Sequence, residues 1–154
     1  MVNMRPFTAF EQKNLKFLVN HNVKFTQVEI TPTGLGKGIL DSTAPMRAYF
    51  LENGIHNYEE QLQGQEHKQI KQACILTDAT QFFTKASFYR PNTKKGDPRM
   101  WIYGFGSYTD GSEIHVLFKF EEALCSVNIT KVDIEKCYNS PIITPLQEII
   151  KAIY

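Results

Sequence analysis

The chain has 154 residues, of which 42% are apolar and 21% are charged, and its 17 Lys and Arg residues nearly balance 16 Asp and Glu residues. This length is typical of one globular domain, so we expect residues 1–154 to form a single domain. Because the apolar runs are shorter than the roughly 20 residues that span a bilayer, and no signal-peptide pattern opens the sequence, we expect a cytoplasmic protein without a membrane partner.

The first element that the chain predicts is a helix. Thr8 and Glu11 fit a capping box, and the apolar residues that follow lie on one helical stripe up to Asn20. Residues 23–30 are rich in β-branched and aromatic side chains, which is typical of a strand.

A glycine-rich segment separates this strand from a second predicted helix. Residues 32–38 hold three glycines and one proline, which favours a loop. The helix after it is expected to begin at a cap on Ser42 or Thr43, with Pro45 in its first turn. Asn53-Gly54 is a typical helix stop signal.

The rest of the chain predicts a surface segment, a series of strands and a final helix. Residues 58–72 are polar and Gln-rich, so we expect them on the surface. Asp110-Gly111 predicts a hairpin turn, and the alternation after it places His115 on the polar side of a strand. A capped helix is expected over residues 144–154. The predicted strands are 74–77, 82–89, 100–105, 113–120 and 123–129.

This order of elements predicts the fold class. Successive strands with helices at both ends favour an α+β fold with a mainly antiparallel sheet, and closure of that sheet into a barrel is left open.

The cysteines and histidines show no pattern of a metal site or a disulfide framework. The four histidines are spread along the chain, and the three cysteines lack C-x-x-C spacing. We therefore expect buried thiols in a reducing compartment and structural or surface histidines. The cysteines are Cys74, Cys125 and Cys137.

The charges of the chain are unevenly distributed. Between Lys85 and Arg99 there are five basic residues and one acid, a net charge of +4. Because the whole chain carries only +1, the remainder carries −3. The near-neutral total excludes a protein that coats DNA along its length, but it is compatible with a protein that contacts DNA through one local element.

The sequence predicts that this basic segment forms a strand–loop–strand unit that fits a DNA groove. Arg90, Asn92 and Arg99 are candidates for contacts to base edges, because Arg and Asn make paired hydrogen bonds to guanine and adenine. Asp97 could orient Arg99 or accept from a cytosine amine. The candidates for phosphate contacts are Lys37, Lys85, Lys94 and Lys95, with Thr33 and Lys37 supplied by the glycine-rich loop.

Other interpretations of the same residues remain open. The basic segment could be a solvated hairpin loop, and Trp101 and Tyr103 are more often core or barrel-face residues than stacking platforms. A protein-interaction domain without DNA affinity is a further alternative.

A nuclease site is another alternative. Glu66-His67-Lys68 matches the Glu-x-Lys half of a metal-dependent nuclease pattern, with Asp41 as the upstream acid. Asp41, Glu66 and Lys68 would then use Mg²⁺, and no cofactor is expected otherwise. Because Glu11-Gln12-Lys13 matches the same short pattern on a helix, the pattern is unspecific.

Four stretches resemble a known family. They resemble the N-terminal region of bacterial type II restriction endonucleases of the EcoRII/MvaI-like kind, and the resemblance covers roughly residues 30–150. Its most specific part is the Tyr-Arg-Pro…Gly-Asp-Pro-Arg…Trp string. The stretches are residues 38–47, 52–58, 63–68 and 88–101.

This resemblance implies a sequence-specific module that binds double-stranded DNA and belongs to a restriction-modification system. It implies a β pseudobarrel with flanking helices, similar to a plant transcription-factor DNA-binding fold, which grips the major groove with two arms. Residues 143–154 would then lead to a catalytic domain. No motif of such a domain follows in this sequence, so the nuclease would be fused elsewhere or separate, and cleavage by this chain alone is not expected.

Overall fold

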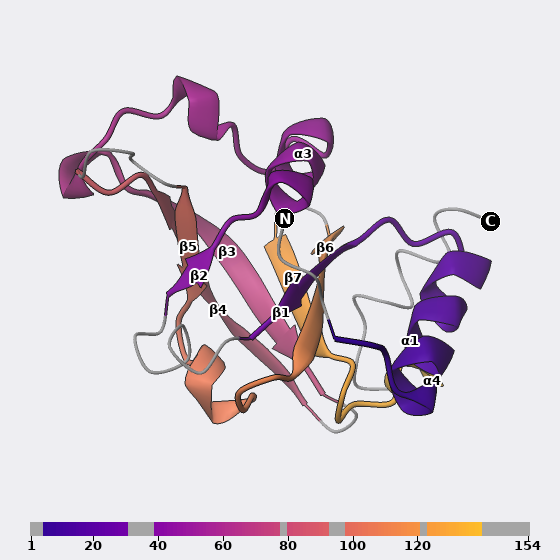
Figure 1. Ribbon diagram of the computed structural model, residues 1–154. Coiled ribbons are helices and arrows are strands. Elements are labelled where there is room, and N and C mark those ends of the chain that lie inside the picture. Colours follow the sequence, from indigo (N-terminus) through magenta and orange to yellow (C-terminus); the bar gives the residue numbers. More distant parts are fainter. Residues whose placement is uncertain (1–4, 31–38, 78–79, 93–97, 121–122, 140–154) are drawn as a thin grey trace.

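The protein has an α+β fold built on one curled sheet. A computed structural model describes residues 5–30, 39–77, 80–92, 98–120 and 123–139 (Figure 1). In these residues three α-helices accompany a seven-stranded sheet that curls into a half-barrel. This confirms the α+β class at the level of architecture.

The sheet is mixed, although most of its strand pairs are antiparallel. The strand order is β1-β6-β7-β3-β4-β5-β2. β3 and β7 run parallel, while the other neighbouring strands run antiparallel, as the sequence predicts. The strands are β1 (Thr26–Glu29), β2 (Leu40–Asp41), β3 (Gln69–Leu76), β4 (Gln81–Tyr89), β5 (Arg99–Ile102), β6 (Ile114–Phe120) and β7 (Ala123–Asn128).

Helix α1 (Ala9–Asn20) begins at the predicted capping box. The Glu11 backbone N–H donates to Thr8 Oγ1 at 3.1 Å, and the Thr8 N–H donates to Glu11 Oε1 at 2.8 Å. The same buried carboxylate pairs with Arg5 at 2.6 Å and accepts from the Thr130 hydroxyl. The hydrogen bond from Arg5 lowers the pKa of Glu11 to about 2, although burial opposes this shift.

Two further helices differ in how well the sequence predicts them. Helix α3 (Ala44–Glu52) has Thr43 as its N-cap and ends at Asn53, as expected. Helix α4 (Ile134–Asn139) was not predicted, because six residues carry too little periodicity. Asp133 caps its start by accepting from the N–H of Glu135 at 3.0 Å.

Two hydrophobic cores lie on opposite faces of the sheet. The inner core has residues from all seven strands and from α3, so it fills the inside of the curl. The outer core packs α1 and α4 against β3, β6 and β7. In Figure 1 these two helices lie on one side of the molecule, while β4, β5 and β2 lie on the other.

The position of β6 in the sheet overturns two expectations. His115 is fully buried, not solvent-facing, because β6 is an interior strand with core residues on both faces. Asp110-Gly111 does not close a hairpin, because β6 pairs with β1 and β7 and not with β5. Instead, the turn is tied to Glu113, whose Oε1 accepts from the Asp110 N–H at 2.6 Å.

The predicted surface segment over residues 58–72 is only partly correct. Tyr58 and Gln61 are buried, in and just after a 3₁₀ turn at Tyr58–Glu60, and β3 already begins at Gln69. The three cysteines are buried thiols, as predicted. The predicted loop at 32–38 and the helix at 144–154 lie outside the described residues. Within the described residues, no helix has the length and apolar character needed to cross a membrane.

Candidate nucleic-acid interface

The candidate site is built where β2 and β5 meet. Asp41 and Arg99 are register partners on these strands, and Arg99 Nε lies 3.6 Å from Asp41 Oδ1. The Asp41 side chain is 84% exposed and that of Arg99 is 35% exposed, whereas the Arg99 Nε atom itself is buried and has no hydrogen-bond partner among the described residues. A pair of this kind holds Arg99 weakly and leaves it able to exchange partners.

Behind Arg99 lies a buried tyrosine. The Tyr58 hydroxyl donates to the Arg99 carbonyl oxygen at 3.0 Å and lies 2.6 Å from the Ser42 hydroxyl. Burial raises the pKa of Tyr58, so the hydroxyl keeps its proton at neutral pH. Tyr58 therefore fixes the backbone at the start of β5.

Gln61 joins the segment before β3 to the end of β4. Its side-chain amide donates to the carbonyl oxygens of Phe88 and His67, at 2.8 and 2.9 Å. Its Oε1 lies 2.9 Å from the Nε2 atom of His56, whose ring stacks on Phe88. Burial lowers the pKa of His56, which favours the neutral ring as a partner.

Arg90 extends from the end of β4 onto this same segment. Its Nη1 donates to the Gln61 carbonyl oxygen at 3.4 Å, and its own carbonyl oxygen accepts from the Gly64 N–H at 2.8 Å. Gly64 has φ +112°, a conformation that favours glycine. Arg90 and Arg99, which flank residues 91–98, are thus both fixed through their backbones.

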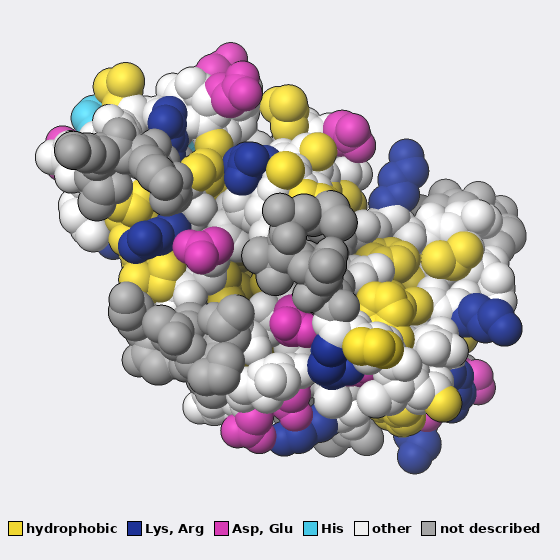
Figure 2. Space-filling model, viewed as in Figure 1, with side chains coloured by type: hydrophobic (Ala, Val, Ile, Leu, Met, Phe, Trp, Pro, Cys, Tyr) yellow, Lys and Arg dark blue, Asp and Glu magenta, His cyan; other side chains and the backbone are white. Residues whose placement is uncertain are grey.

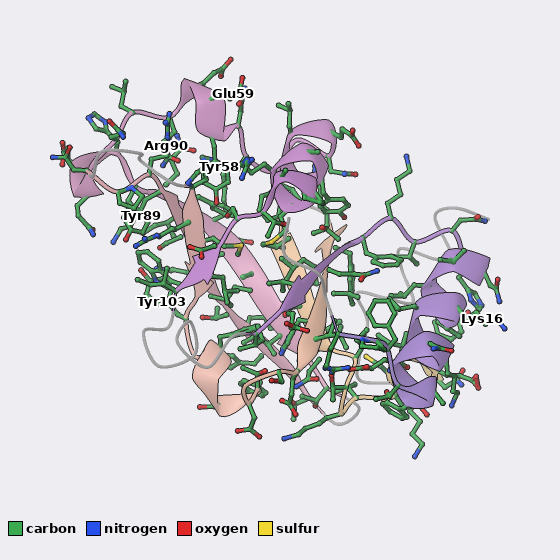
Figure 3. All side chains as sticks on the ribbon, in the orientation of Figure 1. Lys16, Tyr58, Glu59, Tyr89, Arg90 and Tyr103 are labelled. Atoms are coloured by element: carbon green, nitrogen blue, oxygen red, sulfur yellow. The ribbon has the colours of Figure 1, made fainter. Side chains whose placement is uncertain are left out.

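Aromatic and basic side chains cover the side of β4 and β5 that faces away from the inner core. We call the set Lys68, Lys85, Ser87, Tyr89, Trp101 and Tyr103 the outer β4–β5 face. Its strand residues alternate with inner-core residues such as Phe88 and Met100. Figure 3 shows Tyr103, Tyr89 and Arg90 on this side of the molecule, opposite Lys16 on α1.

The electrostatics of this side favour an anionic partner. Lys85 is exposed on β4, and Lys68 Nζ lies 5.2 Å from the centroid of the Trp101 ring. Figure 2 shows Lys and Arg side chains at the end of the molecule that carries β2 and β5, beside hydrophobic ones. Among the described residues of β2, β4 and β5, Asp41 is the one acidic residue, and it already pairs with Arg99.

The structure places some of the predicted site residues and not others. Arg90 and Arg99 lie at the ends of the predicted strand–loop–strand unit, Asn92 is exposed beside Arg90, and Lys85 lies on the outer β4–β5 face. The residues outside the described ranges are Thr33, Lys37, Lys94 and Lys95.

The three nuclease candidates have separate contacts. Asp41 pairs with Arg99, Glu66 lies 3.8 Å from His67, and Lys68 lies over Trp101. Lys68 precedes the start of β3, and β4 and β5 separate that strand from the strand of Asp41. Within the described part of the chain, no three His, Cys, Asp or Glu side chains are grouped to hold a metal ion.

Comparisons with protein-family models, with curated proteins and with solved structures found no match to this chain. The site therefore has to be interpreted from its own residues.

Sequence reasoning missed part of this site. It favoured core or barrel-face positions for Trp101 and Tyr103, and the structure places Tyr103 on the outer face, where it is 40% exposed. It did not connect Tyr89 or Lys68 with them. Lys85, Ser87 and Tyr89 are spaced two residues apart, as expected for side chains on one face of a strand, and this spacing could have indicated the outer β4–β5 face.

Proposed function

We propose that the protein binds double-stranded DNA and reads a short sequence with the β4–β5 unit. One observation carries the proposal. Arg90 and Arg99 flank the most basic segment of the chain, and both are fixed from behind by buried polar groups. A backbone held in place presents the arginine side chain from a fixed position, which reduces the ordering that binding to a base edge or a phosphate requires.

The connection between two neighbouring strands supports the same function. β4 and β5 are antiparallel neighbours inside the sheet and are joined through the basic residues 90–98, so Arg90 and Arg99 lie at the same end of the two strands. In this proposal Arg90, Asn92 and Arg99 contact base edges. Lys85, Lys94 and Lys95 contact phosphates, assisted by Thr33 and Lys37 from the segment between β1 and β2.

A role as the recognition module of a restriction-endonuclease-type system is part of this proposal. It depends on the resemblance of residues 38–47 and 88–101, and the α+β class of the fold is compatible with it. A fused or separate nuclease would then supply cleavage.

Selection of bound duplexes from a random-sequence library tests the proposal. We expect enrichment of one short sequence, and tighter binding of that duplex than of a scrambled one in fluorescence anisotropy at two salt concentrations. If the selection enriches no sequence and the protein shows no measurable affinity for duplex DNA at low salt, the protein-interaction alternative is favoured.

A further inference from the structure

The outer β4–β5 face carries a fixed arrangement of three aromatic rings. The Tyr89 and Trp101 rings have centroids 5.3 Å apart and an interplanar angle of 78°. The Trp101 and Tyr103 rings are 6.0 Å apart at 87°. The sheet register produces this arrangement, because Tyr89 pairs with Arg99 and Ser87 pairs with Trp101.

Tyr103 is the most exposed of the three rings and is held at several atoms. Its hydroxyl lies 3.1 Å from the buried Ser87 hydroxyl. Its N–H donates to the Lys85 carbonyl oxygen, and its own carbonyl oxygen accepts from the Thr84 hydroxyl, each at 3.0 Å. The side chain is nevertheless 40% exposed. A ring that is both exposed and held can accept a flat partner with little further loss of entropy.

The charges around these rings select the kind of flat partner. Lys68 Nζ lies over Trp101, and Lys85 is exposed on the neighbouring strand. A neutral sugar stacked on aromatic rings would not need these cations, whereas a nucleotide brings a phosphate to them. Stacking on aromatic side chains beside basic groups is how proteins bind unpaired bases.

We propose that the outer β4–β5 face is a binding site for single-stranded DNA, in which an unpaired base stacks on the exposed ring of Tyr103, next to Trp101. Lys68 and Lys85 bind the adjacent phosphates. This site is separate from the base-edge contacts of Arg90, Asn92 and Arg99, and it does not require that the protein bind duplex DNA.

Trp101 provides a direct measurement, because it is the single tryptophan of the chain. A short oligothymidylate is titrated into the full chain while tryptophan fluorescence is recorded. We expect saturable quenching, and weaker binding by about tenfold for Tyr103→Ala, in the range measured for the loss of one base–aromatic stack. Tyr103→Phe keeps the ring and is expected to bind nearly as well as the wild type.

The matched control is Phe10→Ala, which removes a 36%-exposed aromatic ring from α1. It is expected to bind as the wild type does. An oligonucleotide of equal length with abasic sites has the same phosphates without bases, and we expect it to bind the wild-type protein at least tenfold more weakly. This comparison needs no variant, so it remains decisive if Tyr103→Ala fails to fold.

Two results would overturn the proposal. One is an absence of quenching at low salt, and the other is equal affinity for the oligothymidylate and its abasic counterpart, which would show charge attraction alone. If the selected duplex still binds in either case, the duplex proposal stands and only the stacking site fails. If the oligothymidylate binds and no duplex does, the stacking site stands and the duplex proposal fails.

Discussion

The Tyr58 hydroxyl donates a hydrogen bond to the carbonyl oxygen of Arg99, 41 residues further along the chain. Through this bond the segment after α3 holds the first residue of β5, where the candidate site begins. The same hydroxyl lies 2.6 Å from that of Ser42, next to β2. Tyr58 therefore connects three separate parts of the chain behind the candidate interface.

Tyr58→Phe tests this connection. The substitution leaves the part-buried Arg99 carbonyl and the buried Ser42 hydroxyl with one partner fewer, so we expect a loss of about 1–3 kcal/mol in the free energy of unfolding. Urea denaturation measures it. The control is Tyr108→Phe, since Tyr108 is half-buried and packs through its ring. Equal losses in the two variants would contradict the role given to the Tyr58 hydroxyl.

Arg99→Ala and Lys85→Ala separate base recognition from phosphate binding. We expect Arg99→Ala to weaken binding to the selected duplex by about 1–3 kcal/mol and binding to a scrambled duplex by much less. Lys85→Ala should weaken binding to both duplexes equally and reduce the slope of log K against log salt by about 1. Anisotropy titrations over a range of salt concentrations measure both effects. Lys16→Ala, on α1, is the control for a lost surface charge. If Arg99→Ala weakens both duplexes equally, Arg99 is not a base-reading residue.

The nuclease alternative leads to a different experiment. Because Asp41, Glu66 and Lys68 have separate contacts, we expect a supercoiled plasmid to remain intact when it is incubated with this chain and Mg²⁺. Agarose gels show the outcome. Nicking that Glu66→Ala abolishes would show instead that the chain cleaves DNA, and would require these residues to come together in the complex.

The buried ion pair of Glu11 and Arg5 makes stability depend on acid pH. The folded protein lowers the pKa of Glu11 from 4.5 to about 2, because Arg5 and Thr130 bond the carboxylate. Its stabilising effect is therefore complete above pH 4.5 and is lost as the pH falls towards 2. We expect wild-type protein to lose roughly 3 kcal/mol through this group over that range, and Glu11→Gln to show a flatter curve.

Thermal unfolding between pH 5 and pH 2 measures this difference. Glu59→Gln is the control, because Glu59 is exposed in a 3₁₀ turn away from α1. If Glu11→Gln and wild type lose stability in parallel as the pH falls, the Arg5–Glu11 pair does not contribute as described.

Local signals predicted helices α1 and α3 well, but not α4. The capping box at Thr8 and the cap at Thr43 act within four residues, so the sequence contains all the information they need. The strands β1 and β4 to β7 were also predicted, because β-branched and aromatic residues gather in them, whereas β3 was predicted only in its last residues.

Burial was harder to predict, because it depends on residues far apart in the chain. The polar pattern around Gln61 indicates a surface segment, yet this amide bonds to Phe88, 27 residues away. The alternation around His115 indicates one solvent face, but that face of β6 is covered by the inner core, where the His115 ring lies 4.4 Å from the Phe105 ring. The grouping of Tyr89, Trp101 and Tyr103 likewise depends on the β4–β5 register, which the sequence alone does not specify.

His115 gives a second dependence of stability on pH. Its Nδ1 lies 3.0 Å from the Ser126 hydroxyl, while its buried Nε2 has no hydrogen-bond partner in the described structure. Burial lowers its pKa from 6.5 to about 3, so the folded state keeps the ring neutral. Below pH 6.5 the unfolded chain takes up a proton that the folded protein does not, and stability falls until the pH reaches about 3.

We expect the free energy of unfolding to fall by roughly 2–3 kcal/mol through this histidine between pH 6.5 and pH 4.5. His115→Gln can still bond to Ser126 and does not titrate, so its free energy of unfolding should be lower at neutral pH but should fall less over this interval. Urea denaturation at several pH values measures the slope. His67→Gln, at an exposed position beside Glu66, is the control and should keep the wild-type slope. A His115→Gln curve parallel to that of the wild type would mean that the folded protein protonates His115 as readily as the unfolded chain does, which burial in a closed core opposes.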